Sequence, residues 1–278
     1  MKVFLKKILA VVVLYNEELE KTSTFRSLCE AIPNGSVLDI FVYDNSPNRK
    51  ASDKIEHNKI SIQYVHDPTN PGVSAAYNYG ASFANQKHKE WLLILDQDSI
   101  INPDYFDVLF KSIRTDINYY MPILKYKDQI YSPCIVRYSK GFPLKEVTKG
   151  RIKTENLNFL NSGAFIRLSS FLSISGYNET IPLYFSDFDF FKRLKKKESY
   201  YYQLEVEFKH SLSFVEDSNL DNFILKFRLY SKGLREYLAV NREDMFLGVI
   251  FGLLRCAKQS FKHKTFVFFR VFYQELLP

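Results

Sequence analysis

Two carboxylates that stand one residue apart, Asp96 and Asp98, come directly after the apolar run from Trp91 to Leu95. A run of this kind predicts a strand that is covered on both faces. Because side chains alternate along a strand, we expect both carboxylates to leave the same face. Carboxylate oxygens at the end of a sheet strand suit Mg²⁺ or Mn²⁺ carrying a diphosphate. The alternative is a solvated acidic turn after a core strand.

A second pair of acids, Asp187 and Asp189, lies in the apolar stretch PLYFSDFDFF. Burial raises the pKa of a carboxylic acid toward that of a useful general base, and a nearby cation lowers it. The alternative is the start of a helix, in which Ser186 or Asp187 is the cap and the acids interact with the helix dipole.

Other metal-ligand candidates are few. His210 ends the β-like stretch YYQLEVEFKH and could complete a metal site, although a lone histidine is more often structural. The cysteines Cys29, Cys134 and Cys256 are far apart and form no C-x-x-C pair. This argues against a zinc site or a disulfide framework and favours a reducing compartment.

The elements that must position these side chains follow a simple alternation. Strands are predicted at Ile8 to Tyr15, Val37 to Tyr43, Ile60 to Val65 and Trp91 to Leu95. The stretches between them that suit helices are Glu17 to Ala31, Lys50 to Asn58 and Ser74 to Gln86. Strands that alternate with helices predict βαβ units and a mostly parallel sheet. From Tyr119 to Gly150 the pattern loosens, and we expect irregular strands and loops there.

The loops after these strands are polar, and a parallel sheet delivers them to one edge. They contain Tyr15-Asn16, Asp44-Asn45-Ser46, Asn70 to Ser74 and Asp96-Gln97-Asp98. Gly72 would let the backbone approach a ligand, and Ser74 could cap a helix whose N-terminus favours phosphate. The alternative for Asn-Pro-Gly is a plain turn. The absence of G-x-G-x-x-G and G-x-x-x-x-G-K-[ST] argues against a dinucleotide-binding fold and a P-loop.

The composition is that of a globular protein. Of its 278 residues, 46% are hydrophobic and 25% charged, which excludes a disordered or broadly membrane-spanning chain. The N-terminal run ILAVVVLY is short and leads into acidic residues, so it predicts a first strand and not a signal peptide. The net charge of +7 is compatible with nucleic acid, with anionic lipid or with simple solubility.

The basic residues are concentrated at the C-terminus. From Met245 onward one acid, Glu275, stands against five basic residues, Arg255, Lys258, Lys262, Lys264 and Arg270, interleaved with apolar and aromatic segments. The uncharged runs are too short to span a bilayer as a helix. A basic amphipathic segment lying on an anionic membrane is one interpretation, and a pair of helices packed on the domain is the other.

The motifs together resemble a known family. In chain order they are YNE, VYDNS, NPGVSAAYNYGASFA, LLILDQDS, NSGAFIR, FSDFDFFKRL and a last strand ending in histidine. This order resembles the inverting family 2 glycosyltransferases of the GT-A fold, and it is most similar to the rhamnosyltransferase-like members. The likeness covers about residues 8 to 215, and LREYLAVNR at 234–242 resembles the R-x-Y-x-x-x-x-R segment that often follows their catalytic domain.

The resemblance implies an α/β fold of the GT-A type, which is Rossmann-like with a mostly parallel central sheet and flanking helices. The catalytic domain would occupy residues 1–215, and residues 216–278 would form a basic, aromatic helical extension that is a candidate for membrane association. An inverting transferase of this kind would act in the cytoplasm, peripherally on the inner face of the plasma membrane. It would contribute to bacterial surface polysaccharide (O-antigen) synthesis.

The resemblance also assigns roles to residues. Asp96 and Asp98 match the D-x-D motif that holds Mg²⁺ or Mn²⁺ and the donor diphosphate, and His210 matches a histidine that supports this metal. Asp187 matches the general base, although Ser186 stands where the motif usually has an acid. The remaining donor-binding matches are Tyr15, Asn16, Asp44, Asn70, Gly72 and Asn78. The acceptor-side candidates are Ser186, Phe188, Asp189 and Arg193.

The reaction expected from the resemblance is transfer of a sugar, first L-rhamnose from dTDP-rhamnose and otherwise a hexose from a UDP-sugar. The acceptor would be a glycan or a lipid-linked oligosaccharide, and no nucleic acid would take part. Two alternatives remain open. LLILDQDS also resembles the D-x-D motif of haloacid-dehalogenase-like phosphatases, in which the first Asp is a nucleophile, although three strands precede it here. The other is an inactive carbohydrate-binding GT-A module.

Overall fold

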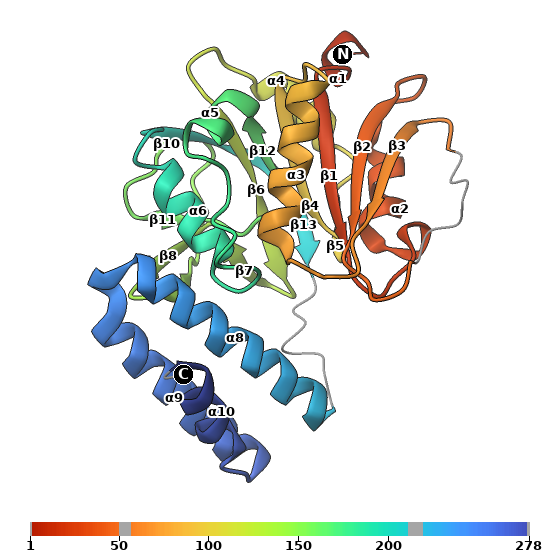
Figure 1. The fold of residues 1–278 in the computed structure, drawn as a ribbon. Helices are drawn as coiled ribbons and strands as arrows, with labels where there is room; N and C mark the ends of the chain where they lie inside the picture. Colours follow the sequence, from red (N-terminus) through yellow and green to blue (C-terminus); the bar gives the residue numbers. More distant parts are fainter. Residues whose placement is uncertain (1, 50–56, 211–218, 277–278) are drawn as a thin grey trace.

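The computed structural model describes residues 2–49, 57–210 and 219–276 (Figure 1). In the N-terminal half, helices and strands alternate as expected from the sequence. The elements are α1 (Lys2–Leu5), β1 (Ile8–Leu14), η1 (Leu19–Lys21), α2 (Ser23–Ala31), β2 (Leu38–Asp44), β3 (Ile60–His66), α3 (Val73–Gln86), β4 (Trp91–Asp96), β5 (Ser99–Ile100) and α4 (Tyr105–Ser112). The helix expected from Lys50 to Asn58 falls mostly outside the described residues.

Strands dominate the next part of the chain, and helices end it. The elements are β6 (Tyr119–Tyr126), β7 (Gln129–Ser132), β8 (Cys134–Arg137), β9 (Lys140–Pro143), β10 (Gly150–Lys153), β11 (Leu157–Asn158), β12 (Ala164–Arg167), α5 (Leu168–Ser173), α6 (Ser186–Leu194) and β13 (Tyr200–His210). They are followed by α8 (Leu220–Val240), η2 (Arg242–Asp244), α9 (Met245–His263) and α10 (Val267–Leu276).

A single large sheet forms the centre of the molecule (Figure 1). Its main path runs β10-β13-β6-β12-β4-β1-β2-β3, with β5 paired to β13 and β7 to β6. β4, β1, β2 and β3 are parallel neighbours, whereas β12 is antiparallel to both β4 and β6. The α/β fold expected from the sequence is confirmed. The antiparallel strand β12 joins a parallel half to a mixed half.

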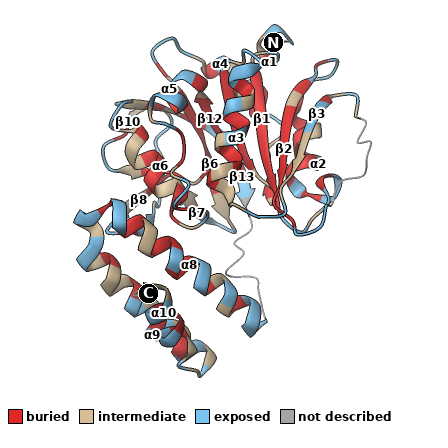
Figure 2. Cartoon of the chain, viewed as in Figure 1, coloured by how far each residue is buried: buried red, intermediate tan, exposed pale blue. Residues whose placement is uncertain are grey.

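Helices cover both faces of this sheet, so its central strands are buried on both sides (Figure 2). The even-numbered residues of β1, such as Ala10 and Val12, pack in a core with α2 and α4. The odd-numbered residues, such as Leu9 and Val11, pack in a second core with α3, α5 and α6. This alternation is the period of a strand, and it explains why β1 is apolar throughout.

The segment from Tyr119 to Gly150 is more regular than we expected. It forms β6 in the middle of the sheet and the hairpin β8–β9, which pairs with β11 in a small second sheet. Pro122 conceals the strand in the sequence, because proline removes a ladder donor and normally argues against a central strand. Here the pairing of β6 with β13 shifts register next to Pro122, between Gln203 and Glu207, so the missing N–H interrupts no regular ladder.

Three helices at the C-terminus form a separate layer below the sheet in Figure 1. α8 packs against α9 and α10, and its buried side chains share a core with Ile181 and Phe185 of the α/β part. The helical extension expected from the sequence is therefore present. The expected boundary at residue 215 lies outside the described residues, so the division 1–215 and 216–278 remains a prediction.

Candidate active site at the carboxyl edge of the sheet

The carboxyl ends of three parallel strands meet at one edge of the sheet. Leu14 at the end of β1 is paired with Asp44 of β2, and Val13 is paired with Asp96 of β4. The two carboxylates thus end the strands on either side of β1. This is the edge at which open α/β sheets bind ligands.

Hydrogen bonds join the loops that follow these strands. The N–H of Tyr15 donates to Oε1 of Gln97 at 2.7 Å, and Nε2 of Gln97 donates to the carbonyl of Tyr15 at 3.2 Å. The N–H of Asn16, which adopts a positive φ of 56°, donates to Oγ of Ser46 at 2.8 Å. The side chain of Tyr15 remains 47% exposed, so its ring is accessible to a ligand while its backbone is held in place.

Asp44 is more deeply buried than we expected for a residue that binds the donor. It is fully buried; its Oδ1 accepts from the N–H of Ser46 at 2.9 Å, and its Oδ2 accepts from the hydroxyl of Tyr64. The guanidinium of Arg49 lies 5.3 Å from the centre of the Tyr64 ring. A nucleotide base that reached Asp44 would therefore also meet Tyr64, a residue that the sequence analysis did not select.

Asp96 is held by side chains from both faces of the sheet. Its Oδ1 accepts a 2.7 Å hydrogen bond from the hydroxyl of Tyr77, which lies fully buried on α3. Its backbone carbonyl accepts from Oγ1 of Thr24 at 2.5 Å, and its N–H donates to Oγ of Ser162 at 3.3 Å. Burial and the neighbouring charge of Asp96 together raise the pKa of Tyr77 well above its usual value, so Tyr77 stays a hydrogen-bond donor.

Asp98 does not extend the strand, contrary to our expectation. β4 ends at Asp96, and Gln97 and Asp98 form a turn before β5, so the alternation of a strand does not govern Asp98. Both carboxylates nevertheless act on one side chain, because the charges of Asp96 and Asp98 each contribute to the raised pKa of Tyr77.

Asp187 lies in the first turn of α6 and shares this region with Asp96. Burial is the main cause that raises the pKa of Asp187 to about 7, and the charge of Asp96 raises it further. A 2.8 Å hydrogen bond from the N–H of Phe188 to Oδ1 acts in the opposite direction. The charge of Asp187 in turn contributes to the raised pKa of Tyr177 and of Cys134. Asp187 is thus a carboxyl group with the pKa of a general base.

The chain that leads into α6 is fixed on two sides. Phe185 adopts a positive φ of 71°, which is uncommon for a bulky side chain, immediately before the helix begins. Its buried ring packs against the rings of Tyr230 and Tyr237 on α8, with centroids 5.2 and 5.6 Å away. The C-terminal helices therefore stabilise the turn that positions Asp187.

The N-terminus of α3 fixes the other side of this chain, which corrects our expectation of a phosphate site there. The N–H of Val73 donates to the carbonyl of Pro182 at 2.7 Å, and Oγ of Ser74 donates to the carbonyl of Ile181 at 2.5 Å. Ser74 is inside the helix, and the capping position is Gly72, which makes no side-chain cap. The first amides of α3 thus bind protein carbonyl groups and support the Asp187 segment.

Residues 9–171 match the sequence model of the family described as Glycosyl transferase family 2. The match covers more than half of the chain and includes Asp44, Asp96 and Asp98. The chain belongs to this family. Asp187 lies beyond the matched range, so the match itself says nothing of its role. A comparison with curated proteins finds no match.

Solved structures with the same fold share little sequence with this glycosyltransferase. TarS 1–349 from S. aureus has 14% identity and a TM-score of 0.54, over 86% of this chain and 74% of that chain. The mannosyltransferase PcManGT from Pyrobaculum calidifontis, in complex with GDP-Man and Mn²⁺, has 14% identity and a TM-score of 0.57, over 85% and 64%. GalNAc-T7, with UDP, GalNAc and Mn²⁺, has 13% identity and a TM-score of 0.53, over 82% and 50%. These likenesses show the GT-A fold.

Membership of this family argues against the phosphatase interpretation of the D-x-D motif. The remaining residues that we expected to bind the donor lie just before α3 or within it. Asn70 and Gly72 both have positive φ values, 50° and 96°, in the turn before α3. Asn78 holds a loop: its Nδ2 donates to the carbonyl of Tyr177 at 2.9 Å and to Oε1 of Glu179 at 2.8 Å. Asn78 of this glycosyltransferase therefore fixes the backbone of Tyr177.

The acceptor-side candidates of this glycosyltransferase divide into two groups. Ser186 and Asp189 are buried: Ser186 donates to the carbonyl of Leu183 at 2.6 Å, and Asp189 pairs with Arg193 at 2.7 Å. These contacts stabilise α6 and the chain around it. Phe188 is only partly buried and remains a candidate for contact with an acceptor.

The expected metal ligands are incompletely described. His210 is the last residue of β13, where its backbone pairs with Ser99, but its side chain lies outside the described part. Within the described part of the chain, no group of three or more His, Cys, Asp or Glu side chains is placed to hold a metal ion. Asp96 and Asp98 alone still fit Mg²⁺ or Mn²⁺ in a donor complex, because these ions often use one or two carboxylates together with phosphate oxygens and water.

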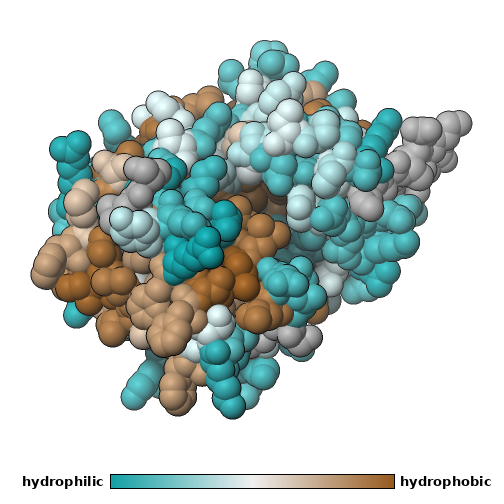
Figure 3. All heavy atoms as spheres, turned by 60° about the horizontal axis from the view of Figure 1, so that its bottom comes forward, coloured by the Kyte–Doolittle hydropathy of each residue, from teal (hydrophilic) through white to brown (hydrophobic). Residues whose placement is uncertain are grey.

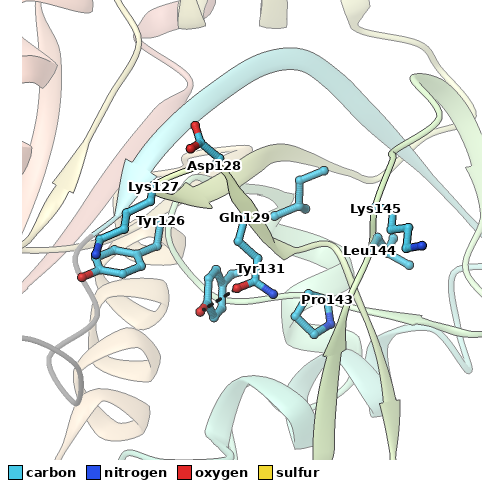
Figure 4. Close-up of a pocket in the computed structure, with 9 residues that line it drawn as sticks. Tyr126, Lys127, Asp128, Gln129, Tyr131, Pro143, Leu144 and Lys145 are labelled. Carbon is cyan, nitrogen blue, oxygen red and sulfur yellow. Dashed lines mark hydrogen bonds between the residues drawn. The ribbon is translucent and has the colours of Figure 1, made fainter.

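A separate pocket opens beside the hairpin β6–β7 (Figure 4). It has a volume of about 730 Å³ and contains none of the expected site residues. Its lining residues are Tyr126, Lys127, Asp128, Gln129, Ile130, Tyr131, Pro143, Leu144 and Lys145. In the close-up, the hydroxyl of Tyr131 donates to Oε1 of Gln129 at 3.3 Å, so part of the polar lining is already paired.

Four residues of the site were not predicted from the sequence: Tyr64, Tyr77, Tyr177 and Cys134. Tyr77 precedes buried Gly80, Ala81 and Ala84 at helical spacing, so the period of α3 could have shown that it faces the sheet. Cys134 lies far in sequence from Asp187, and Tyr177 lies far in sequence from Asp96, although each experiences the charge of that acid. Only the folded chain brings them together.

Proposed function

We propose that this family 2 glycosyltransferase inverts the configuration of the sugar it transfers and that Asp187 is its general base. The observation that carries the proposal is the carboxyl of Asp187, whose pKa is raised to about 7 beside Asp96. A base is most effective when its pKa lies near the working pH. The charge of Asp96 contributes to this pKa, which supports a base that lies within electrostatic range of the carboxylates proposed to hold the donor diphosphate.

Asp96 and Asp98 are proposed to hold Mg²⁺ or Mn²⁺ together with a nucleotide-diphosphate sugar. The ion would neutralise charge that develops on the leaving diphosphate. Similar structures support this assignment, since they contain UDP or GDP-Man with Mn²⁺. Tyr15 and Asn16 would border the nucleotide, and Asp44 with Tyr64 would lie behind its base.

In the proposed reaction, an unprotonated oxygen of Asp187 accepts the proton of an acceptor hydroxyl. The hydroxyl oxygen attacks the anomeric carbon on the face opposite the diphosphate, and the carbon–diphosphate bond breaks. Phe188 would border the acceptor. Tyr177, whose hydroxyl donates to Oδ1 of Asn161 at 2.7 Å and whose pKa is raised by the charge of Asp187, would limit access of water to this base.

The proposed function includes a donor sugar and an acceptor. L-rhamnose from dTDP-rhamnose is the first candidate on the motif resemblance, followed by UDP-linked hexoses. The complex of TarS 1–349 with UDP-GlcNAc supports a UDP-sugar as a donor class. A glycan or lipid-linked oligosaccharide is the proposed acceptor in surface polysaccharide synthesis, at the inner face of the plasma membrane.

A thermal-shift screen of dTDP, UDP, GDP and CDP, each with and without Mn²⁺, tests donor binding, since a ligand that binds only the folded state raises Tm. We expect Mn²⁺-dependent stabilisation by dTDP or UDP, and its loss in Asp98→Ala. No shift with any of the four nucleotides would overturn the donor assignment.

The variant Asp187→Asn tests the base. Because a general base contributes about 10² to 10⁴ in rate, turnover should fall by that factor while nucleotide affinity is unchanged. Asp107→Asn, at an exposed position on α4, is the matched control and should retain wild-type turnover. Undiminished turnover in Asp187→Asn would exclude this residue as the base.

A further inference from the structure

The outer face of α9 carries large apolar side chains. Phe246 is 77% exposed, Leu254 58% and Phe261 89%, and Leu253 is exposed beside them. Their spacing of seven or eight residues places them on one side of the helix. Figure 3, which turns the C-terminal helices of Figure 1 toward the viewer, shows apolar surface gathered over this part of the molecule.

The inner face of α9 is made of small side chains. Gly248, Gly252, Cys256 and Ser260, four residues apart, are the buried positions of the helix. A Cβ on Gly248 would lie 2.7 Å from a methyl group of Leu238, so the helices pack very closely. This is the reverse of a water-soluble bundle, in which the large apolar side chains face inward and the helix surface is polar.

The apolar surface continues beyond α9. Phe266, in the turn after the helix, is 84% exposed, and Phe269 and Tyr273, one turn apart on α10, are exposed by 37% and 65%. Scattered apolar residues on a protein surface are ordinary, but a contiguous group of large ones marks a contact with a partner or a membrane. We name the exposed side chains of α9, α10 and their connecting turn the outer face.

The charges around the outer face are almost all positive. Lys258 and Lys262 are exposed on α9, Lys264 directly follows that helix and Arg270 is exposed on α10. The single acid within α9 and α10, Glu275, is bound by Arg228 at 3.2 Å, and the two acids just before α9, Glu243 and Asp244, are bound by Lys192. Aromatic and aliphatic side chains at the centre with lysine and arginine around them form the pattern of a helix that lies on anionic lipid. Along the described residues, no helix is both long and apolar enough to cross a membrane.

The outer face is also connected to the proposed active site. At the turn of the hairpin β8–β9, Lys140 Nζ lies 5.1 Å from the ring of Phe251 on α9. Next to Lys140, a Cβ on Gly141 would lie 3.3 Å from the ring of Phe188, and at the other end of the hairpin Cys134 experiences the charge of Asp187. One hairpin therefore joins α9 to the side of the site that would receive the acceptor.

We propose that the outer face docks on an anionic lipid surface and thereby presents the acceptor side of the site to molecules held in that membrane. The docking itself stands on the outer face alone. The second step, presentation of a lipid-anchored acceptor, rests on the proposed function. Positive charge selects anionic lipid over a second copy of this chain, whose own outer face would carry the same charge.

Co-sedimentation of the full chain with phosphatidylcholine vesicles, with and without phosphatidylglycerol, tests the docking. Binding should be at least about tenfold tighter to the anionic vesicles, because each basic residue near such a surface strengthens binding about fivefold, and about 0.5 M salt should weaken it. No preference for anionic vesicles would overturn the proposal. So would a stable dimer that buries the outer face and persists with lipid present.

Two substitution pairs identify the face. Phe261→Ser with Phe266→Ser should weaken vesicle binding at least about tenfold through lost apolar contact, and Lys258→Glu with Lys262→Glu should abolish the preference for anionic lipid. The matched controls are Leu172→Ser on α5 and Lys111→Glu on α4, both exposed and outside the C-terminal helices. Wild-type vesicle binding by the two face variants would refute the assignment.

Nucleotide-dependent thermal shift of the same variants keeps the two proposals separate. Folded face variants should keep the wild-type Tm response to nucleotide and Mn²⁺ while they lose vesicle binding. If a double variant shows no cooperative unfolding transition, it does not fold, and the single variant Phe261→Ser is tested in its place. Vesicle binding without any nucleotide response would refute the proposed function and leave the docking intact.

Discussion

The hydroxyl of Tyr77 on α3 donates a 2.7 Å hydrogen bond to Oδ1 of Asp96 at the end of β4. Tyr77 is fully buried, and its ring lies 5.2 Å from that of Tyr177. This hydrogen bond thus joins helix α3 to the central sheet. This hydrogen bond orients the carboxylate of Asp96, so we regard Tyr77 as a positioning residue for the proposed metal and donor site.

We therefore expect Tyr77→Phe to weaken Mn²⁺-dependent nucleotide binding by about tenfold, since a hydrogen bond to a charged group contributes about 1.5–3 kcal/mol. Calorimetric titration of UDP or dTDP in the presence of Mn²⁺ measures this. Tyr79→Phe is the control, because Tyr79 lies two residues away on the same helix with its side chain 54% exposed. Equal affinities in the two variants would show that the Tyr77 hydroxyl has no positioning role.

The pH dependence of turnover should report Asp187. Its pKa in the free protein is about 7, so kcat/KM should fall about tenfold per pH unit below that value as the base is protonated. With metal bound at Asp96, the charge that helps to raise this pKa is neutralised, so the acid limb of kcat should lie at lower pH than that of kcat/KM. A flat kcat/KM profile between pH 5 and 8 would contradict the assignment, since that range includes the expected pKa of about 7.

The N-terminal half of the fold was accessible from the sequence because its signals are local. β1 and β4 are continuous apolar runs, and polar side chains follow them directly. The mixed half was not, because Pro122 interrupts the pattern of β6 and its partner β13 lies some eighty residues away. The position of β12, antiparallel between β4 and β6, could not be predicted, because the residues of these two strands carry no signal for an antiparallel neighbour.

The same difference between local signals and long-range contacts applies to the proposed site. The sequence indicated Asp96, Asp98 and Asp187 by their types and settings, and in the structure the charge of each contributes to the raised pKa of Tyr77 or of Tyr177. It could not show that Asn78 and Ser74 use their hydrogen bonds on other parts of the chain, since both partners lie about a hundred residues away. Residue types predict which groups can bind a ligand, but long-range contacts decide which are available.

The raised pKa of Asp187 also predicts how its removal affects stability. Its folded pKa of about 7 exceeds the ordinary value of 3.8, so the folded chain holds the proton more tightly. The stability that this adds is complete below the ordinary value and is lost as pH rises through about 7. Relative to wild type, Asp187→Asn should therefore gain stability with rising pH, by about 1–2 kcal/mol at pH 8 after allowance for solvent screening.

Urea unfolding of both proteins at pH 5 and pH 8 measures this gain, with pKa values of 3.8 and about 7 setting the window. The difference in free energy of unfolding should be larger at pH 8 than at pH 5. A difference that is constant with pH would mean that Asp187 has an ordinary pKa in the folded chain.

Gly72 joins the turn before α3 to the chain that carries Asp187. It has a φ of 96°, and a Cβ at this position would overlap the carbonyl oxygen of Pro182, which accepts the N–H of Val73. Gly72→Ala should therefore cost both the backbone strain of a positive φ and a steric displacement, about 2–4 kcal/mol of unfolding free energy. Because Pro182 precedes α6, turnover should fall as well.

Gly150→Ala separates the two costs. Gly150 has nearly the same φ, 94°, but no atom lies within 4 Å of the position of a Cβ. Its substitution should cost only the backbone strain, about 1–2 kcal/mol, and should leave turnover unchanged. Urea unfolding and turnover measured on both variants give the steric cost by difference. If the two variants lost equal stability and both kept full turnover, the close approach of Gly72 to Pro182 would have no part in positioning Asp187.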